Sequence, residues 1–187
     1  MSSLLAPQIE DFVAIDPDQL RIDEAEGRGL GVKFCVGSGE DLNFFNNVFD
    51  VIIFTLSLHH QNSVKALNEA KRVLKKGGSI LVVEPVVEGE IEKLFSFLIN
   101  ENQAKLDAQQ AINESGLRID RSQNFTAEWR FDDIAELQKS LFDYYEMEYD
   151  IQGAEKILTV VGEKAGRTPI VIEDLMNIQL LSEPEGN

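Results

Sequence analysis

Apolar residues form short runs, separated by turn-forming residues, in the first part of the chain. The run at residues 49–56 shows no alternation of polar and apolar positions, as expected for a strand that is covered on both faces. This run is the best candidate for a central strand of a sheet. Similar runs at residues 11–16, 32–36 and 79–85 predict three more strands.

Segments of helical character lie between these strands. Asp18 is placed to cap a short helix that ends at Glu26, and apolar residues recur at helical spacing over residues 63–76. Gly77 and Gly78 then end the second helix. The alternation of strands and helices predicts an α/β fold with a doubly wound, mainly parallel sheet that is flanked by helices.

The second half of the chain is less regular. We expect a domain over residues 1–166 and a C-terminal extension over residues 167–187, which packs on the same domain or on a partner subunit. The extension holds two apolar runs, 170–172 and 178–181, separated by a turn-like polar stretch. Before it, the pattern predicts helices at about 90–115 and 132–146 and strands at about 117–125 and 157–163.

Composition and charge narrow the classes of partner. The 187 residues include 33 acidic and 17 basic side chains, which gives a formal net charge of −16. The negative electrostatic field of this charge repels nucleic acid and anionic lipid surfaces, so neither is expected as a partner. The apolar runs are far shorter than the roughly 20 residues needed to span a bilayer, and we expect a soluble, cytoplasmic protein.

Four sequence blocks between residues 11 and 85 carry a family resemblance. They read VAIDPDQL, GVKFCVGSGEDLNF, FDVIIFTLSLHH and ALNEAKRVLKKGGSILVVEP. In order and spacing they resemble the class I S-adenosylmethionine-dependent methyltransferases that act on small molecules. The resemblance implies a Rossmann-like fold, S-adenosylmethionine as cofactor and a small-molecule methyl acceptor.

The resemblance also implies a set of cofactor-binding residues. Asp16 ends a predicted strand, where its carboxylate can accept hydrogen bonds from both ribose hydroxyls. Ser38, followed by Gly39, stands where the family usually has an aspartate near adenine. Asp16 can equally begin a turn before Pro17 or meet the ribose of a nicotinamide dinucleotide, and the Ser38 loop can be a plain surface loop. Leu20, Glu40 and Thr55 complete the expected cofactor site.

The segment TLSLHH, residues 55–60, supplies the candidates for catalysis. It follows a predicted strand and should face the cleft where a methyl group meets its acceptor, so His59 or His60 can act as a general base. Alignment alone also suffices for many transfers from a sulfonium. No metal site is predicted, and the acceptor pocket is expected around Phe125, Trp129 and Phe131.

The family's first strand and glycine-rich loop have no counterpart before the first block. Only ten residues precede Asp11, too few for a strand, a glycine turn and a helix. We therefore expect weak or absent cofactor binding by this chain. We also expect one apolar run of the C-terminal extension to take the place of the missing strand, beside residues 11–16 or 50–56. The run can come from the same subunit or be exchanged within a homodimer. The alternative is that the strands at 11–16 and 50–56 pair directly with each other.

Three functions explain this sequence to different extents. A methyltransferase for a small molecule explains the most residues. A non-catalytic methyltransferase-like interaction or regulatory subunit explains the missing loop, and titration with the cofactor separates these two. A nicotinamide-dependent oxidoreductase shares the acid after a strand but gives no account of the block LKKGGSILVVEP.

Overall fold

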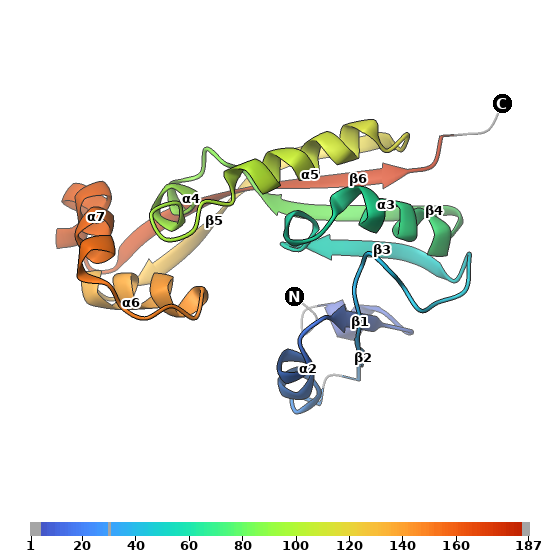
Figure 1. Ribbon diagram of the computed structural model, residues 1–187, viewed down its shortest axis with the longest axis horizontal. Helices are drawn as coiled ribbons and strands as arrows, with labels where there is room; N and C mark the ends of the chain where they lie inside the picture. Colours follow the sequence, from blue (N-terminus) through green and yellow to red (C-terminus); the bar gives the residue numbers. More distant parts are fainter. Residues whose placement is uncertain (1–4, 30, 185–187) are drawn as a thin grey trace.

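The computed structural model describes residues 5–29 and 31–184 of the chain. At the N-terminal end, β1 (Val13–Asp16) and β2 (Lys33–Val36) form a small parallel sheet, joined by helix α2 (Gln19–Glu26). Asp18 caps α2 by accepting a hydrogen bond from the Leu20 amide at 2.8 Å, which confirms the predicted start of the helix. This unit lies beside the larger sheet in Figure 1.

The larger sheet has four strands in the order β3 (Phe49–Thr55), β4 (Leu74–Pro85), β6 (Ile170–Ser182) and β5 (Arg118–Phe131). Strands β3 and β4 are parallel, whereas β6 is antiparallel to both of its neighbours. The expected α/β fold is therefore confirmed, but the expectation of a mainly parallel sheet was wrong, because the sheet is mixed. β3 also lies at the edge of this sheet and not at its centre.

Strand β6 explains the mixed character of the sheet. The two apolar runs of the tail and the polar stretch between them form one continuous strand, in which Ile170, Ile172, Met176 and Leu181 are buried. β6 pairs with β5 over residues 170–182 and with β4 over residues 176–182. Neither run of the tail forms a ladder with β1 or β3 among the described residues, so the expected insertion within the subunit was wrong.

The alternative of direct closure is not formed either. Among the described residues, β1 pairs only with β2 and β3 pairs only with β4. Each of these strands therefore keeps one edge without a ladder. Val51 on β3 is 52% exposed, in keeping with an edge strand.

Five further helices pack against the larger sheet, including the part where only β5 and β6 continue. The helix expected over residues 90–115 is two helices, and the expected strand at 157–163 was wrong. Residues Ala154, Ile157 and Val161 are buried at helical spacing, and the β-branched residues near Val161 had suggested a strand. The helices are α3 (Ser63–Val73), α4 (Glu90–Phe95), α5 (Asn102–Glu114), α6 (Ile134–Tyr144) and α7 (Ile151–Val161), with short 3-10 turns η1 (Ala6–Gln8), η2 (Leu58–His60) and η3 (Gly162–Gly166).

Helix α3 ends at Val73, earlier than expected, because the glycine pair belongs to the start of β4. Gly77 adopts φ +80°, which favours glycine. At Gly78 a Cβ atom would lie 2.7 Å from the Asp50 carbonyl oxygen, so only glycine allows this close approach of β4 to β3. The segment LKKGG therefore sets the register of the parallel pair.

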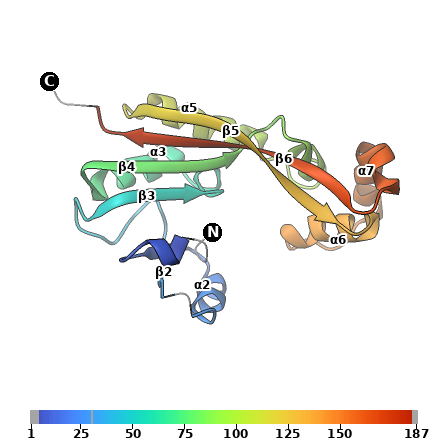
Figure 2. The same ribbon diagram turned by 180° about the vertical axis from the view of Figure 1, so that it is seen from behind.

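Two hydrophobic cores stabilise the fold. One lies between α3, α5 and the four-stranded part of the sheet, with Leu58, Leu67 and Ile80 fully or almost fully buried. The other packs α4, α6 and α7 around the outer halves of β5 and β6. Figure 2 shows these two halves joined by the long β5–β6 ribbon. No helix in the described part of the chain is long and apolar enough to cross a membrane.

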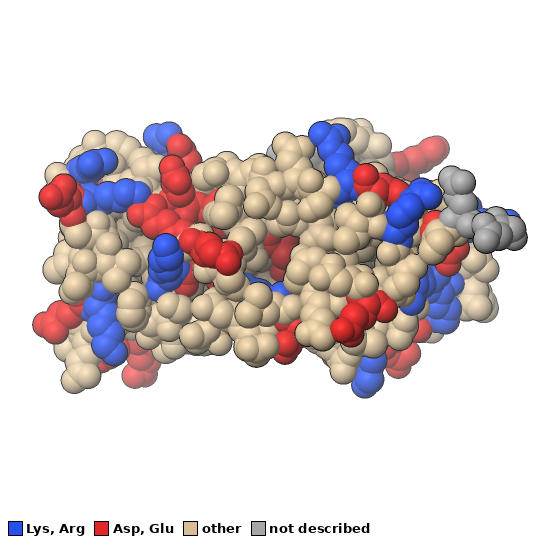
Figure 3. Space-filling model, turned by 90° about the horizontal axis from the view of Figure 1, so that it is seen from above, with Lys and Arg blue, Asp and Glu red and all other residues tan. Residues whose placement is uncertain are grey.

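Basic and acidic side chains are mixed on the surface. On the face shown in Figure 3, Lys and Arg side chains are scattered among Asp and Glu side chains and do not gather in one patch. Arg72 and Lys75 are ion-paired with Glu69 and Asp50 respectively. Arg72 and Lys75 thus hold neighbouring parts of the fold together through these ion pairs.

One of these ion pairs fixes the connection between the two sheets. Arg72 donates to both carboxylate oxygens of Glu69 and to the backbone carbonyls of Leu42 and Phe44, at 2.7–2.8 Å. The Leu42 amide donates to Glu69 in return. The hydrogen bond from Arg72 holds the pKa of Glu69 at about 2, below its usual value of 4.5.

We predict that Glu69→Gln lowers the free energy of unfolding by about 1–2 kcal/mol at neutral pH, because charged hydrogen bonds are lost. The pKa of Glu69 is depressed in the folded state, so its contribution is present above pH 4.5 and is lost as the pH falls toward 2. Urea titrations at pH 7 and pH 3 measure both effects. The variant should differ from the native chain less at pH 3 than at pH 7, and the exposed Glu155→Gln is the control.

Candidate active site

A single carboxylate shapes the turn that follows β3. Glu84, near the end of β4, accepts hydrogen bonds from the amides of Ser57 at 3.1 Å and Leu58 at 2.8 Å through one oxygen. Its other oxygen pairs with Nδ1 of His59. Since Nδ1 faces a carboxylate, it carries the proton and Nε2 is left as an acceptor.

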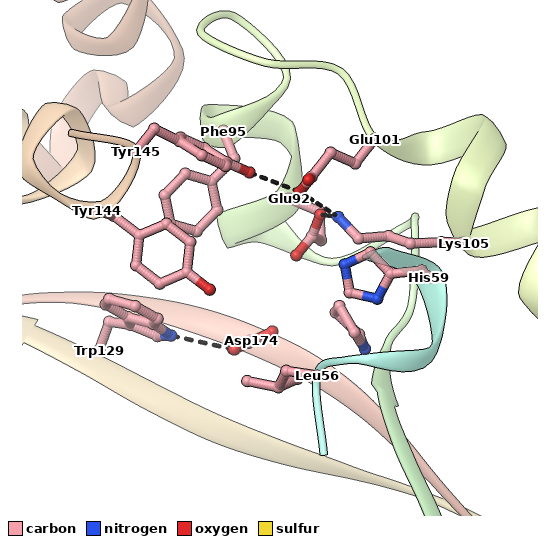
Figure 4. A pocket seen from close by; sticks show the side chains of 11 residues that line it. Leu56, His59, Glu92, Phe95, Glu101, Lys105, Trp129, Tyr144, Tyr145 and Asp174 are labelled. Atoms are coloured by element: carbon pink, nitrogen blue, oxygen red, sulfur yellow. Dashed lines mark hydrogen bonds and ion pairs between the residues drawn. The ribbon is translucent and has the colours of Figure 1, made fainter. Parts of the chain in front are cut away.

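His59 borders a cavity of about 30 Å³ between the two halves of the molecule (Figure 4). The His59 side chain comes from the turn after β3, and the imidazole is almost fully buried. Acidic and aromatic side chains make up most of the remaining wall. The lining residues are Leu56, His59, Pro85, Glu92, Phe95, Glu101, Lys105, Trp129, Tyr144, Tyr145 and Asp174.

A buried ion pair crosses one side of the cavity. Lys105 of α5 pairs with Glu92 of α4, and both side chains are about 95% buried. A second carboxylate, Glu101, lies 3.7 Å from the same ammonium and accepts a hydrogen bond from the Tyr145 hydroxyl at 2.8 Å. Burial raises the pKa of Glu92, although its bond to Lys105 opposes the shift.

The neighbouring histidine is less enclosed. His60 Nδ1 lies 3.3 Å from Glu101, and burial together with the nearby His59 lowers the pKa of His60. Ligand atoms of His59, His60 and Glu101 lie within 4.8 Å of one another, a spacing that can hold a metal ion. His59 would have to use Nε2 there, because its Nδ1 is engaged by Glu84.

Aromatic rings form the opposite wall. The ring of Phe95 lies 4.8 Å from that of Tyr144 and 5.9 Å from that of Trp129, measured between centroids. Trp129 donates its indole N–H to Asp174 at 3.0 Å across β5 and β6. Figure 4 shows the Tyr144 hydroxyl pointing from this wall toward the charged side.

The expected cofactor residues lie at the carboxyl ends of the parallel strands. Asp16 ends β1, where one of its oxygens accepts a hydrogen bond from the Asp18 amide at 2.9 Å. Ser38 and Gly39 follow β2, and Ser38 accepts from the Glu40 amide at 3.1 Å. A Cβ at Gly39 would lie 2.5 Å from the side chain of Gln61, which places this loop against the turn that holds His59.

The other three expected residues have different surroundings. The Glu40 carboxylate accepts a hydrogen bond from the amide of Asn62, the N-cap of α3, at 2.8 Å and lies 3.7 Å from Lys65, so it lies against the start of that helix. Leu20 is 72% exposed on α2. Thr55 is half-buried at the end of β3, close in sequence to the cavity residue Leu56.

Several residues that line the cavity or support the turn of His59 were not singled out from the sequence. Glu84 was visible only as the end of a strand, and the charged residues Glu92, Lys105 and Asp174 belong to the less regular second half. Trp129 does line the cavity, whereas Phe131 is buried in the second core and Phe125 is 40% exposed. Tyr144 and Tyr145 lie at the end of an amphipathic helix, where aromatic residues are usually part of a core.

The fold is that of the solved methyltransferase-like structures. The crystal structure of YcgJ from Bacillus subtilis aligns with a TM-score of 0.64 over 97% of this chain and 86% of that chain, at 18% identity. At this identity the likeness shows an α/β fold of the same kind and does not extend to activity.

Sequence comparison relates the first part of the chain to methyltransferases. Residues 1–82 match the family model described as a methyltransferase domain. The chain is 33% identical over 130 residues to YafE of Escherichia coli and 33% identical over 105 residues to the ubiquinone/menaquinone biosynthesis C-methyltransferase UbiE of Pasteurella multocida. These matches cover 62% and 51% of this chain and only 63% and 39% of the relatives' length. Over residues 1–82 the chain is therefore similar to a methyltransferase domain.

We predict that Lys105→Met lowers the free energy of unfolding by about 3–5 kcal/mol, because it leaves the buried Glu92 without its partner. The double variant Lys105→Met with Glu92→Met should recover most of this loss, since no buried charge of the pair then remains. Denaturant unfolding of the four members of this double-mutant cycle gives the coupling energy. Additive losses would show that Glu92 and Lys105 are stabilised independently.

Proposed function

We propose that the chain transfers a methyl group from S-adenosylmethionine to a small-molecule acceptor held in the cavity beside His59. The observation that supports this is the position of the cavity at the carboxyl ends of β3 and β4, where open α/β sheets bind ligands. The Gly39 loop, which we assign to the adenine side, touches the same turn through Gln61. Donor and acceptor sites would thus share one edge of the fold.

The residues present fit the adenosine part of the cofactor. Asp16 keeps a carboxylate at the end of β1 that can accept hydrogen bonds from ribose hydroxyls, and Ser38 and Gly39 offer a hydroxyl and an open loop near the adenine position. Among the described residues, no strand pairs with the free edges of β1 and β3, where the resemblance places the strand and glycine-rich turn that approach the methionine part. We therefore expect weak binding.

His59 is the favoured base. When bound, the cofactor would supply a methyl group that its sulfonium already activates. His59 Nε2 can take the proton that the acceptor releases, because Glu84 fixes the other nitrogen and stabilises the resulting imidazolium. His60, which is only about half-buried, is the less favoured base because it lies outside the cavity lining.

We predict that the native chain binds S-adenosylmethionine and its demethylated product weakly and that Asp16→Ala weakens this binding about tenfold, because a charged acceptor is lost. Isothermal calorimetry measures both affinities. Asp11→Ala, at the other end of the same segment, removes the same charge and should change neither. Equal affinities for the native chain and Asp16→Ala would show that Asp16 does not hold the ribose.

We also predict that His59→Gln lowers the rate of methyl transfer about 10²-fold or more, whereas His60→Gln retains most of it. Transfer of a labelled methyl group to a panel of small acceptors measures these rates. Retention of the full rate by His59→Gln would leave alignment alone as the source of catalysis.

A non-catalytic methyltransferase-like subunit is the second candidate. It is favoured by the unpaired edges of β1 and β3, which offer sites for a strand from another polypeptide. Cofactor binding together with measurable transfer would exclude this candidate. The absence of both would favour it.

A further inference from the structure

The lining of the cavity carries an excess of negative charge. Three carboxylates, those of Glu92, Glu101 and Asp174, line the cavity together with one ammonium group, that of Lys105. Lys105 is already bound to Glu92 and lies near Glu101, so its charge is engaged at one side. Asp174 lies apart from this network, on β6, next to the aromatic wall.

One of the two carboxylate oxygens of Asp174 has no hydrogen-bond partner among the described residues. Oδ2 accepts the indole N–H of Trp129, whereas Oδ1 is buried and has no hydrogen-bond partner among the described residues. A buried carboxylate oxygen without a donor is destabilising, so a donor from outside the chain would be favourable there. The donor would be bound most strongly if it carried positive charge.

The aromatic wall suits the same kind of ligand. Tyr144 and Trp129 present π systems, which attract organic cations through the negative charge of the ring faces. Burial and the neighbouring acids raise the pKa of Tyr144, so its hydroxyl stays protonated. A site for a bare metal ion would be expected to offer oxygen and nitrogen ligands on most sides and not a wall of rings.

We propose that the cavity binds the ammonium group of an organic amine, held by Asp174 and the Trp129–Tyr144 wall, and that amines are the acceptor class of this methyltransferase. The volume of about 30 Å³ suits one group the size of a water molecule or an ammonium group. The rest of the amine would leave past Tyr144, which is 45% exposed. For methyl transfer, the ammonium would first lose a proton to His59 Nε2, which frees the nitrogen lone pair that accepts the methyl group. The acceptor assignment rests on the proposed function, whereas the amine site does not.

Trp129 is the only tryptophan of the chain and therefore reports on this cavity by its fluorescence. The native chain, without cofactor, is titrated with n-butylammonium chloride at constant ionic strength and pH 7. Butan-1-ol, in which a hydroxyl replaces the ammonium, and potassium chloride are the comparison ligands. We expect a saturable change with n-butylammonium, at least tenfold weaker binding of butan-1-ol, and no change with potassium.

Variants connect the signal to the proposed contacts. Asp174→Asn keeps an acceptor for Trp129 and removes the charge, so we expect n-butylammonium to bind at least tenfold more weakly. Tyr144→Leu, at a partly exposed position, should weaken binding about two- to fivefold. Asp107→Asn removes an exposed acid of α5 that does not line the cavity and should have no effect.

The outcomes separate the two proposals. No saturable response, an equal response to butan-1-ol or potassium, or unchanged binding by Asp174→Asn would overturn the amine site. If Asp174→Asn does not fold, the Tyr144→Leu titration and the comparison of ligands still decide. Amine binding without methyl transfer to amines would support the site and contradict the acceptor assignment, and failure of transfer to every acceptor class would instead contradict the proposed function.

Discussion

The antiparallel insertion of β6 between β4 and β5 is the constraint on which the arrangement of this molecule depends. Without β6, β5 would have no strand partner, because it shares no ladder with β4. The same insertion places Asp174 opposite Ala127, two residues before Trp129 on the neighbouring strand. The indole N–H therefore meets the carboxylate across the ladder, and the cavity gains both a ring and a charge from one strand pairing.

The first half of the fold was predictable because its signals are local. Asp18 capped a helix and residues 49–55 formed a strand, whereas the glycine pair, which was expected to end a helix, lies within β4 where it approaches β3. The second half depended on partners far apart in the sequence. The polar stretch inside β6 had suggested a turn, yet it lies in a strand that pairs with β5 along its whole length, where its neighbours and not its own composition decide its conformation.

The site was predictable to a similar extent. His59 stood out because it follows a strand end, and this position does place it at the cavity. Glu92 and Lys105 are separated by 13 residues and lie on different helices, so their pairing has no counterpart in any local pattern. The place of Asp174 in the cavity depends on the pairing of β6 with β5, which the sequence did not predict. Residues whose roles arise from tertiary contacts could not be assigned from one sequence.

The placement of the cavity between two hydrophobic cores has a consequence for motion. His59 and Lys105 belong to the half built on α3 and α5, whereas Phe95 and Tyr145 are part of or packed against the core around α6 and α7. The halves are joined by the β5–β6 ribbon (Figure 2), whose outer part has two strands because β4 pairs with β6 only from Met176 onward. Two-stranded ribbons twist more strongly than wide sheets. Flexing of the ribbon would change the distance between the charged wall and the aromatic wall. A ligand that contacts both walls would therefore restrict their relative motion. Amide hydrogen exchange along the ribbon would then slow when the cavity is filled.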